Sequence, residues 1–212
     1  MANFFSASAD EQIDLLSLWW NKFKYLLGVL LVASVIFIVY RDYSISSLNT
    51  KQLESARLYD NFLSSTLDDK KNKAKEIIEL YSDTLYADFA ALHLAKIGVD
   101  EDNLKYAEQN LNWVISRSSS SWDTKFNPMQ SIAKLRLARI YLEQGNPAGV
   151  LDLLEEEQIL TASLHEVKGD AERLLSQISK AKLSYLQALE LSNSQPIRSL
   201  ISMKISDLKE GK

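Results

Sequence analysis

The segment LRLARIYLEQGNPAGVLDLL, residues 135–154, shows how most of this chain is built. Its apolar residues recur at steps of three and four, which is the period of an α-helix with one buried face. Gly145 and Pro147 interrupt this pattern near its middle, and both residue types are typical of a turn between helices. Because a short turn forces the two helices to lie antiparallel, the segment predicts a helical hairpin.

Apolar residues recur at helical steps on both sides of this hairpin. The pattern breaks at 65–69, 100–103, 116–128, 145–147 and 192–196. No stretch after Tyr43 alternates apolar and polar residues between turn dipeptides, as a β-strand would. We therefore expect an all-α fold of stacked helical hairpins. The residues expected to form its core include Leu92, Ala95 and Val99; Leu104, Ala107, Leu111, Trp113 and Val114; Leu135, Ala138, Tyr141 and Leu142; and Leu183, Leu186 and Leu189.

Small residues mark the places where the two helices of a hairpin are expected to meet. Ala95 precedes Ala107 by 12 residues, and Gly169 precedes Ala181 by the same 12. Small side chains at these positions let neighbouring helices approach closely, and a larger one such as Tyr185 fills the remaining space.

This arrangement resembles the tetratricopeptide repeat. The best match is residues 135–154, with Leu137, Ala138, Tyr141 and Gly145 in order, and residues 179–191 match the second helix of such a unit. We expect three degenerate repeats and a capping helix pair, forming an α-solenoid domain over residues 44–212. A helical bundle that buries the same residues without making a groove is the competing interpretation.

Three positions depart from the pattern of the repeat. Gly98 stands where a tyrosine is usual, Glu157 where a small residue is expected, and Pro147 lies within a turn. In the first hairpin, around residues 50–82, only Ala74 and Ile78 match well.

The composition supports long helices and excludes several kinds of site. The chain has only 6 Gly and 3 Pro, where average usage gives about 25, which argues against a glycine-cradled nucleotide site. It has no cysteine, so disulfide scaffolds, thiolate metal sites and a cysteine nucleophile are excluded. Its net charge of −4 argues against a nucleic-acid partner.

The run YLLGVLLVASVIFIVY, residues 25–40, carries no charge and predicts a single transmembrane helix. As a helix it is about 24 Å long, and its flanks from 19 to 43 extend it to about 37 Å, enough to cross a lipid core of about 30 Å. Aromatic and basic side chains in these flanks are expected at the membrane interface. They are Trp19, Trp20, Lys22, Lys24, Tyr40, Arg41 and Tyr43.

The charges around this run bear on its processing and orientation. A cleaved signal peptide is a competing interpretation, but residues 1–24 contain Asp10, Glu11 and Asp14 instead of a short positive leader. Two lysines precede the run and Arg41 alone follows it directly. This bias predicts a cytoplasmic leader at 1–24 and a domain on the other side of the membrane. The opposite orientation remains an alternative.

The whole layout resembles the YfgM-like family, the ancillary subunits of the bacterial SecYEG translocon. The segments that carry this resemblance are 86–96 (YADFAALHLAK), 132–145 (IAKLRLARIYLEQG), 167–175 (VKGDAERLL) and 203–208 (MKISDL). The resemblance implies a bacterial inner-membrane protein with a periplasmic repeat domain. Its implied partners are SecYEG and a membrane-anchored periplasmic chaperone of the peptidyl-prolyl isomerase type. Its implied role is a scaffold that links exported chains to periplasmic chaperones. An adaptor of the same shape for cell-wall synthesis or division is the alternative.

In a stack of helical hairpins, the first helix of each hairpin lines the concave face. The positions expected there are Phe89, His93 and Lys96, followed by Ile132, Arg136, Arg139 and Glu143. We hypothesise that Lys96, Arg136 and Arg139 form a basic groove for acidic or carboxylate-bearing segments. An ordinary solvated helix face is the alternative. The loop residues Trp122 and Phe126 are further candidates for protein contacts, or for caps on neighbouring helix ends.

The sequence argues against an enzyme. His93 and His165 are the only histidines, and neither lies in an acid–base or zinc-binding motif. The acidic runs at 100–102 and 155–157 cannot converge on a cation, because consecutive helical residues point in different directions. We therefore expect no catalytic residue, metal, cofactor or small-molecule substrate.

Overall fold

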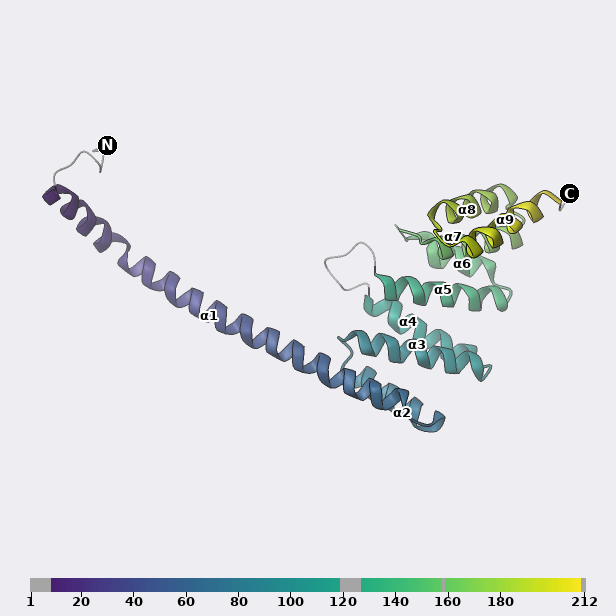
Figure 1. The fold of residues 1–212 in the computed structure, drawn as a ribbon, viewed down its shortest axis with the longest axis horizontal. Helices are drawn as coiled ribbons and strands as arrows, with labels where there is room; N and C mark the ends of the chain where they lie inside the picture. The colour runs from purple at the N-terminus through teal and green to yellow at the C-terminus, as the bar shows by residue number, and fades with distance from the viewer. Residues whose placement is uncertain (1–8, 119–126, 158, 211–212) are drawn as a thin grey trace. The chain divides into compact units, whose positions relative to one another are not determined.

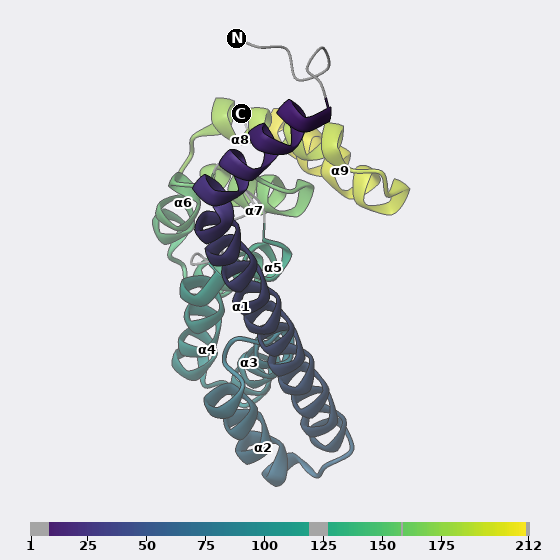
Figure 2. The same cartoon turned by 90° about the vertical axis from the view of Figure 1, so that its left-hand side faces the viewer.

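The computed structural model describes residues 9–118, 127–157 and 159–210, and all regular structure within these ranges is helical. The chain divides into two compact units, with the boundary between Glu54 and Ser55. From α2 onward the helices stack in chain order, which two perpendicular views show (Figures 1 and 2). The helices are α1 (Ala9–Leu63), α2 (Leu67–Leu80), α3 (Leu85–Asp100), α4 (Leu104–Ser118), α5 (Pro128–Glu143), α6 (Pro147–Glu155), α7 (Ala162–Leu174), α8 (Ile178–Leu191) and α9 (Gln195–Glu210).

Helix α1 contains the predicted membrane span. Its stretch Lys22–Leu63 includes an 18-residue window of mean hydropathy 2.3 with no buried residue, so the helix is long and apolar enough to cross a membrane. A core helix would bury much of such a window. The expected interface residues Trp20, Tyr40 and Tyr43 are well exposed, while the side chain of Trp19 lies outside the described residues. The helix continues without interruption past residue 40 to Leu63.

The same turn joins the two helices of three successive hairpins, α3/α4, α5/α6 and α7/α8. In each turn a backbone N–H donates to the carbonyl five residues earlier, and the preceding residue has a positive φ. This combination is the Schellman motif that commonly ends helices. Because the turns match, residues at the same distance from them are structurally equivalent. The hydrogen bonds run from Asn103 to Gly98 (2.7 Å), Asn146 to Tyr141 (2.8 Å) and Gln177 to Glu172 (2.8 Å), and the positive φ values are 57° at Asp102, 72° at Gly145 and 59° at Ser176.

Small residues set how closely the helices of a hairpin approach. A Cβ atom added to Gly98 would lie 2.8 Å from the backbone nitrogen of Ala107, so the tyrosine usual at this position cannot fit. A Cβ atom added to Gly169 would lie 2.5 Å from the ring of Tyr185, which is fully buried. Ala95 and Ala107, which were expected to meet, lie in one buried cluster. The tight contact of Gly98 with Ala107 explains why Gly98 departs from the usual repeat. The contact of Gly169 with Ala181 stays a prediction.

The expected core assignment is wrong for part of α8. Leu183 is 58% exposed and Leu186 is 45% exposed, while α8 buries Ala181, Ser184, Tyr185 and Ala188. Both faces of α8 repeat at helical steps, and the face with small residues is the one that α7 can approach closely. Val99 is also exposed, at 43%. In the first hairpin, Ile77 is fully buried and Ile78 only partly.

Ion pairs join helices of the stack near its beginning and near its end. The guanidinium of Arg117 on α4 binds both carboxylate oxygens of Asp88 on α3, with Nε to Oδ1 at 2.8 Å. Asp88 is only 2% exposed, and burial raises the pKa of its carboxyl group although Arg117 opposes this. At the other end, Lys204 on α9 lies 2.7 Å from a carboxylate oxygen of Glu166 and of Asp170 on α7. Both contacts fix the relative positions of helices in the stack.

Glu157 and Pro147, which depart from the repeat pattern, have structural roles. The carboxylate of Glu157 forms an ion pair with Lys134 on α5, and both side chains are mostly buried. Pro147 is the first residue of α6, a position where its missing N–H costs no hydrogen bond.

Replacing Ser176 by glycine is expected to stabilise the protein. Ser176 adopts a left-handed conformation that costs a residue with a Cβ atom about 1 kcal/mol. Ser176→Gly should therefore raise the free energy of unfolding of the full chain in detergent, measured by denaturant titration, by up to about 1 kcal/mol.

The matched control is Gly145→Ser at the equivalent turn. No atom lies within 4 Å of a Cβ added there, so only the backbone conformation is penalised. This variant should be less stable than the native chain. Unchanged or lower stability of Ser176→Gly would contradict the proposed equivalence of the turns.

Candidate functional site

Two adjoining hollows lie between α3 and α5, with volumes of about 210 and 360 Å³. Lys96 and Arg136 line both hollows. The two hollows therefore form one continuous surface, which we call the α3–α5 groove. The first hollow is lined by Tyr59, Phe89, Leu92, His93, Lys96, Met129, Ile132 and Arg136, and the second by Ala95, Lys96, Val99, Leu111, Arg136, Arg139, Ile140 and Glu143.

The structure brings together most of the residues that the sequence singled out. The opposite face of α3 is buried through residues such as Ala90 and Leu94, which leaves the predicted positions facing the groove. The predicted residues that line the groove are Phe89, His93, Lys96, Ile132, Arg136, Arg139 and Glu143. The other two candidates, Trp122 and Phe126, lie outside the described residues.

His93 lies among aromatic rings at one end of the groove. Its ring centroid is 5.2 Å from that of Phe62, edge to face, and 6.2 Å from that of Tyr59. Burial lowers the pKa of His93 below its usual 6.5, and the nearby positive charges of Lys70, Arg136 and Lys96 lower it further. His93 is therefore mostly neutral at pH 7, and the charge of this region comes mainly from the surrounding cations.

Arg136 occupies the centre of the groove. Its Nη1 donates to the backbone carbonyl of Leu92 on α3 at 3.2 Å, which connects the two walls. A guanidinium carries five N–H donors, so others remain for a ligand, and two of them match the geometry of a carboxylate. The side chain is exposed, which makes these donors accessible.

The other basic side chains of the groove form no strong ion pair within the described part of the chain. Lys96 lies 2.6 Å from Asp100, but both side chains are more than half exposed, so this ion pair contributes little. Arg139 is exposed, and none of the ion pairs among the described residues includes it. With Glu143 as the only acidic lining residue, the groove carries a net positive charge in an acidic chain.

Part of the apolar floor of the groove was not predicted from the sequence. Tyr59 comes from the last turns of α1, and Met129 from the first turn of α5. Leu58, Tyr59 and Phe62 do recur at helical spacing, which could have indicated a buried face. Leu92 and Leu111 were assigned to the core, and they are buried but still reach the hollows.

The groove has the chemistry of a binding surface. It combines an apolar floor with basic side chains at the rim, which suits an extended peptide that carries both apolar and acidic side chains. Among the described residues no group of three acidic or histidine side chains could hold a metal ion.

A family model described as tetratricopeptide repeat-like domain matches residues 18–210. The chain belongs to this family. The match includes the whole apolar run at 25–40 as well as the hairpins, so it covers α1 from residue 18 onward.

Curated relatives confirm the resemblance to the YfgM-like family. An "Ancillary SecYEG translocon subunit" of Haemophilus influenzae is 26% identical over 220 residues, covering 96% of this chain and 99% of the relative. A protein of the same name from Buchnera aphidicola subsp. Schizaphis graminum is 25% identical, covering 82% of this chain and 90% of the relative.

A solved structure supports the solenoid fold independently. A Podosopora anserina kinesin light chain with nearly identical TPR-like repeats superposes on this chain with a TM-score of 0.51 and 15% sequence identity. The superposition covers 78% of this chain and 86% of the kinesin light chain structure. At this identity the likeness concerns the fold alone. It confirms the expected α-solenoid of degenerate tetratricopeptide-like hairpins.

The two histidines allow the electrostatics of the groove to be measured directly. In the full chain with labelled histidine rings, nuclear magnetic resonance should show His93 titrating below 6.5, because protonation is opposed by burial and by nearby cations. Arg136→Gln should raise the pKa of His93, since it removes one of these cations.

His165 is the internal control, because its pKa is lowered by burial and by Lys168, with no contribution from Arg136. Because the pKa of His93 is lower in the folded chain, the unfolded chain binds a proton there first, so the free energy of unfolding decreases as pH falls from about 6.5 to the lower native pKa of His93. A pKa of His93 at or above 6.5 in the native chain would contradict this description of the groove.

Proposed function

We propose that this chain is a membrane-anchored, protein-binding scaffold of the Sec translocon in the bacterial inner membrane. In this proposal its helical repeats lie in the periplasm and link exported chains to periplasmic chaperones. The chain binds proteins and performs no catalysis.

The observation that carries the proposal is the nearly end-to-end match to the ancillary translocon subunit of Haemophilus influenzae. That match spans 96% of this chain and 99% of the relative, so it includes the apolar helix and the repeats in the same order. An anchor and a repeat domain of matching length support a shared attachment to SecYEG.

The α3–α5 groove is the proposed contact site for extended segments. A segment still emerging from a translocon is unfolded and exposes both apolar and charged side chains. Arg136 and Arg139 would bind carboxylates of such a segment, while Tyr59, Phe89 and Leu111 would contact its apolar side chains. A membrane-anchored chaperone of the peptidyl-prolyl isomerase type is the proposed second partner, to which the segment is passed.

Charge reversal in the groove is expected to weaken partner binding. Arg136→Glu/Arg139→Glu places two negative charges where carboxylates are proposed to bind, so co-purification of translocon subunits and exported chains with the full-length protein should fall about tenfold. Like charges at a desolvated contact repel strongly, whereas rim contacts far from it have little effect.

The matched control changes the net charge by the same amount away from the groove. Lys75 on α2 and Lys105 on α4 are exposed and line neither hollow, so Lys75→Glu/Lys105→Glu should leave co-purification unchanged. An equal effect of both double variants, or none of either, would count against the groove. Co-purification of cell-wall or division proteins in place of translocon subunits would favour the alternative adaptor role.

Protease treatment of spheroplasts tests the proposed orientation. With residues 1–24 in the cytoplasm, the repeats are exposed at the outer surface of a spheroplast and should be digested without detergent. Repeats that resist protease in intact spheroplasts and are digested only after lysis would indicate the opposite orientation.

A further inference from the structure

The outer face of α8 differs from the equivalent faces of α4 and α6. Leu183 and Leu186 lie six and nine residues after Gln177, the last residue of the hairpin turn. The same two positions hold exposed polar residues in the earlier hairpins. These residues are Gln109 and Asn112 on α4, and Asp152 and Glu155 on α6. Leucines therefore replace polar residues at two solvent-facing positions of the third hairpin only.

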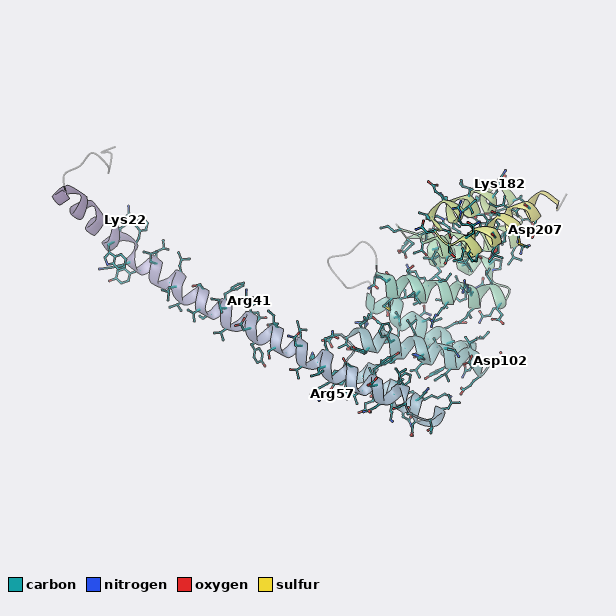
Figure 3. The ribbon with its side chains drawn as sticks, viewed as in Figure 1. Lys22, Arg41, Arg57, Asp102, Lys182 and Asp207 are labelled. Atoms are coloured by element: carbon teal, nitrogen blue, oxygen red, sulfur yellow. The ribbon has the colours of Figure 1, made fainter. Side chains whose placement is uncertain are left out.

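The leucines lie between two opposite charges on the same face. Lys182 precedes Leu186 by four residues and Glu190 follows it by four, so all three side chains lie along one side of the helix. Both charged residues are exposed, and Lys182 is labelled on α8 in Figure 3. They are about 12 Å apart along the axis, too far to pair within one helix. We call Lys182, Leu183, Leu186 and Glu190 the α8 outer face.

We infer that the α8 outer face binds the same face of a second copy of the chain. A twofold axis at Leu186 makes the two α8 helices antiparallel, which places Lys182 of each copy opposite Glu190 of the other. Leu186 then contacts its own equivalent at the centre. Such a self-complementary patch is what an interface with twofold symmetry requires.

The charge pattern favours a second copy over other occupants. A lipid surface would select basic residues on both sides of the leucines, and an acidic partner helix would leave Glu190 opposite a like charge. A single helix face is a small interface, which alone gives weak association. A membrane anchor favours association of the copies because it confines them to one plane and raises their local concentration.

Cysteine cross-linking tests the inference, because the native chain has no cysteine. In membranes containing the full-length protein, Leu186→Cys should form a disulfide-linked dimer on mild oxidation, since the two residues meet at the axis. Asn112→Cys and Glu155→Cys, at the equivalent positions of α4 and α6, should remain monomeric. Leu186 is exposed, so its replacement leaves the packing of α7 and α8 intact.

Charge exchange in the Leu186→Cys background tests the pairing. Lys182→Glu alone, and Glu190→Lys alone, should each lower the cross-linked fraction about fivefold because like charges then face each other. The double exchange Lys182→Glu/Glu190→Lys should restore it. The inference is overturned if Leu186→Cys cross-links no better than Asn112→Cys, if it cross-links mainly to a different protein, or if the double exchange fails to restore the dimer.

Discussion

The close approach of paired helices at small residues is the constraint on which the rest of the structure depends. Gly98 against Ala107 and Gly169 against Tyr185 leave no room for a further side-chain carbon atom. The α3/α4 and α7/α8 hairpins are thus fixed by their inner faces, and other faces of the stacked helices are left for other contacts. On α3 and α5 these faces line a basic groove, and on α8 such a face carries exposed leucines.

Most of the architecture could be predicted from periodicity and from glycine and proline. The α5/α6 turn contains Gly145 and Pro147, and its prediction is confirmed. A hairpin was expected around the α7/α8 turn, but the turn itself was not located, because Ser176 adopts the left-handed conformation there in place of glycine. Periodicity also failed on α8, where leucines and small residues recur on opposite faces. Only the tertiary contact with α7 decides which of these faces is buried.

The candidate site was predictable where it depends on one helix, and not where it depends on several. The spacing of Phe89, His93 and Lys96 places them on one face of α3 without any knowledge of the fold. The contribution of Tyr59 required the structure, since it comes from the end of α1. The same holds for the lowered pKa of His93, which results from burial and from nearby cations, two of which, Lys70 and Arg136, lie on other helices.

The central claim is that the α3–α5 groove is the protein-binding face of a membrane-anchored repeat domain. Its most direct test is a photoreactive amino acid at Ile132, which lines the groove, in the full-length protein of growing cells, with Gln109 on the outer face of α4 as the comparison position. The account predicts cross-links from position 132 to translocon subunits, exported chains or a membrane-anchored chaperone, and few from position 109. Equal cross-linking from both positions, or none from position 132, would contradict it.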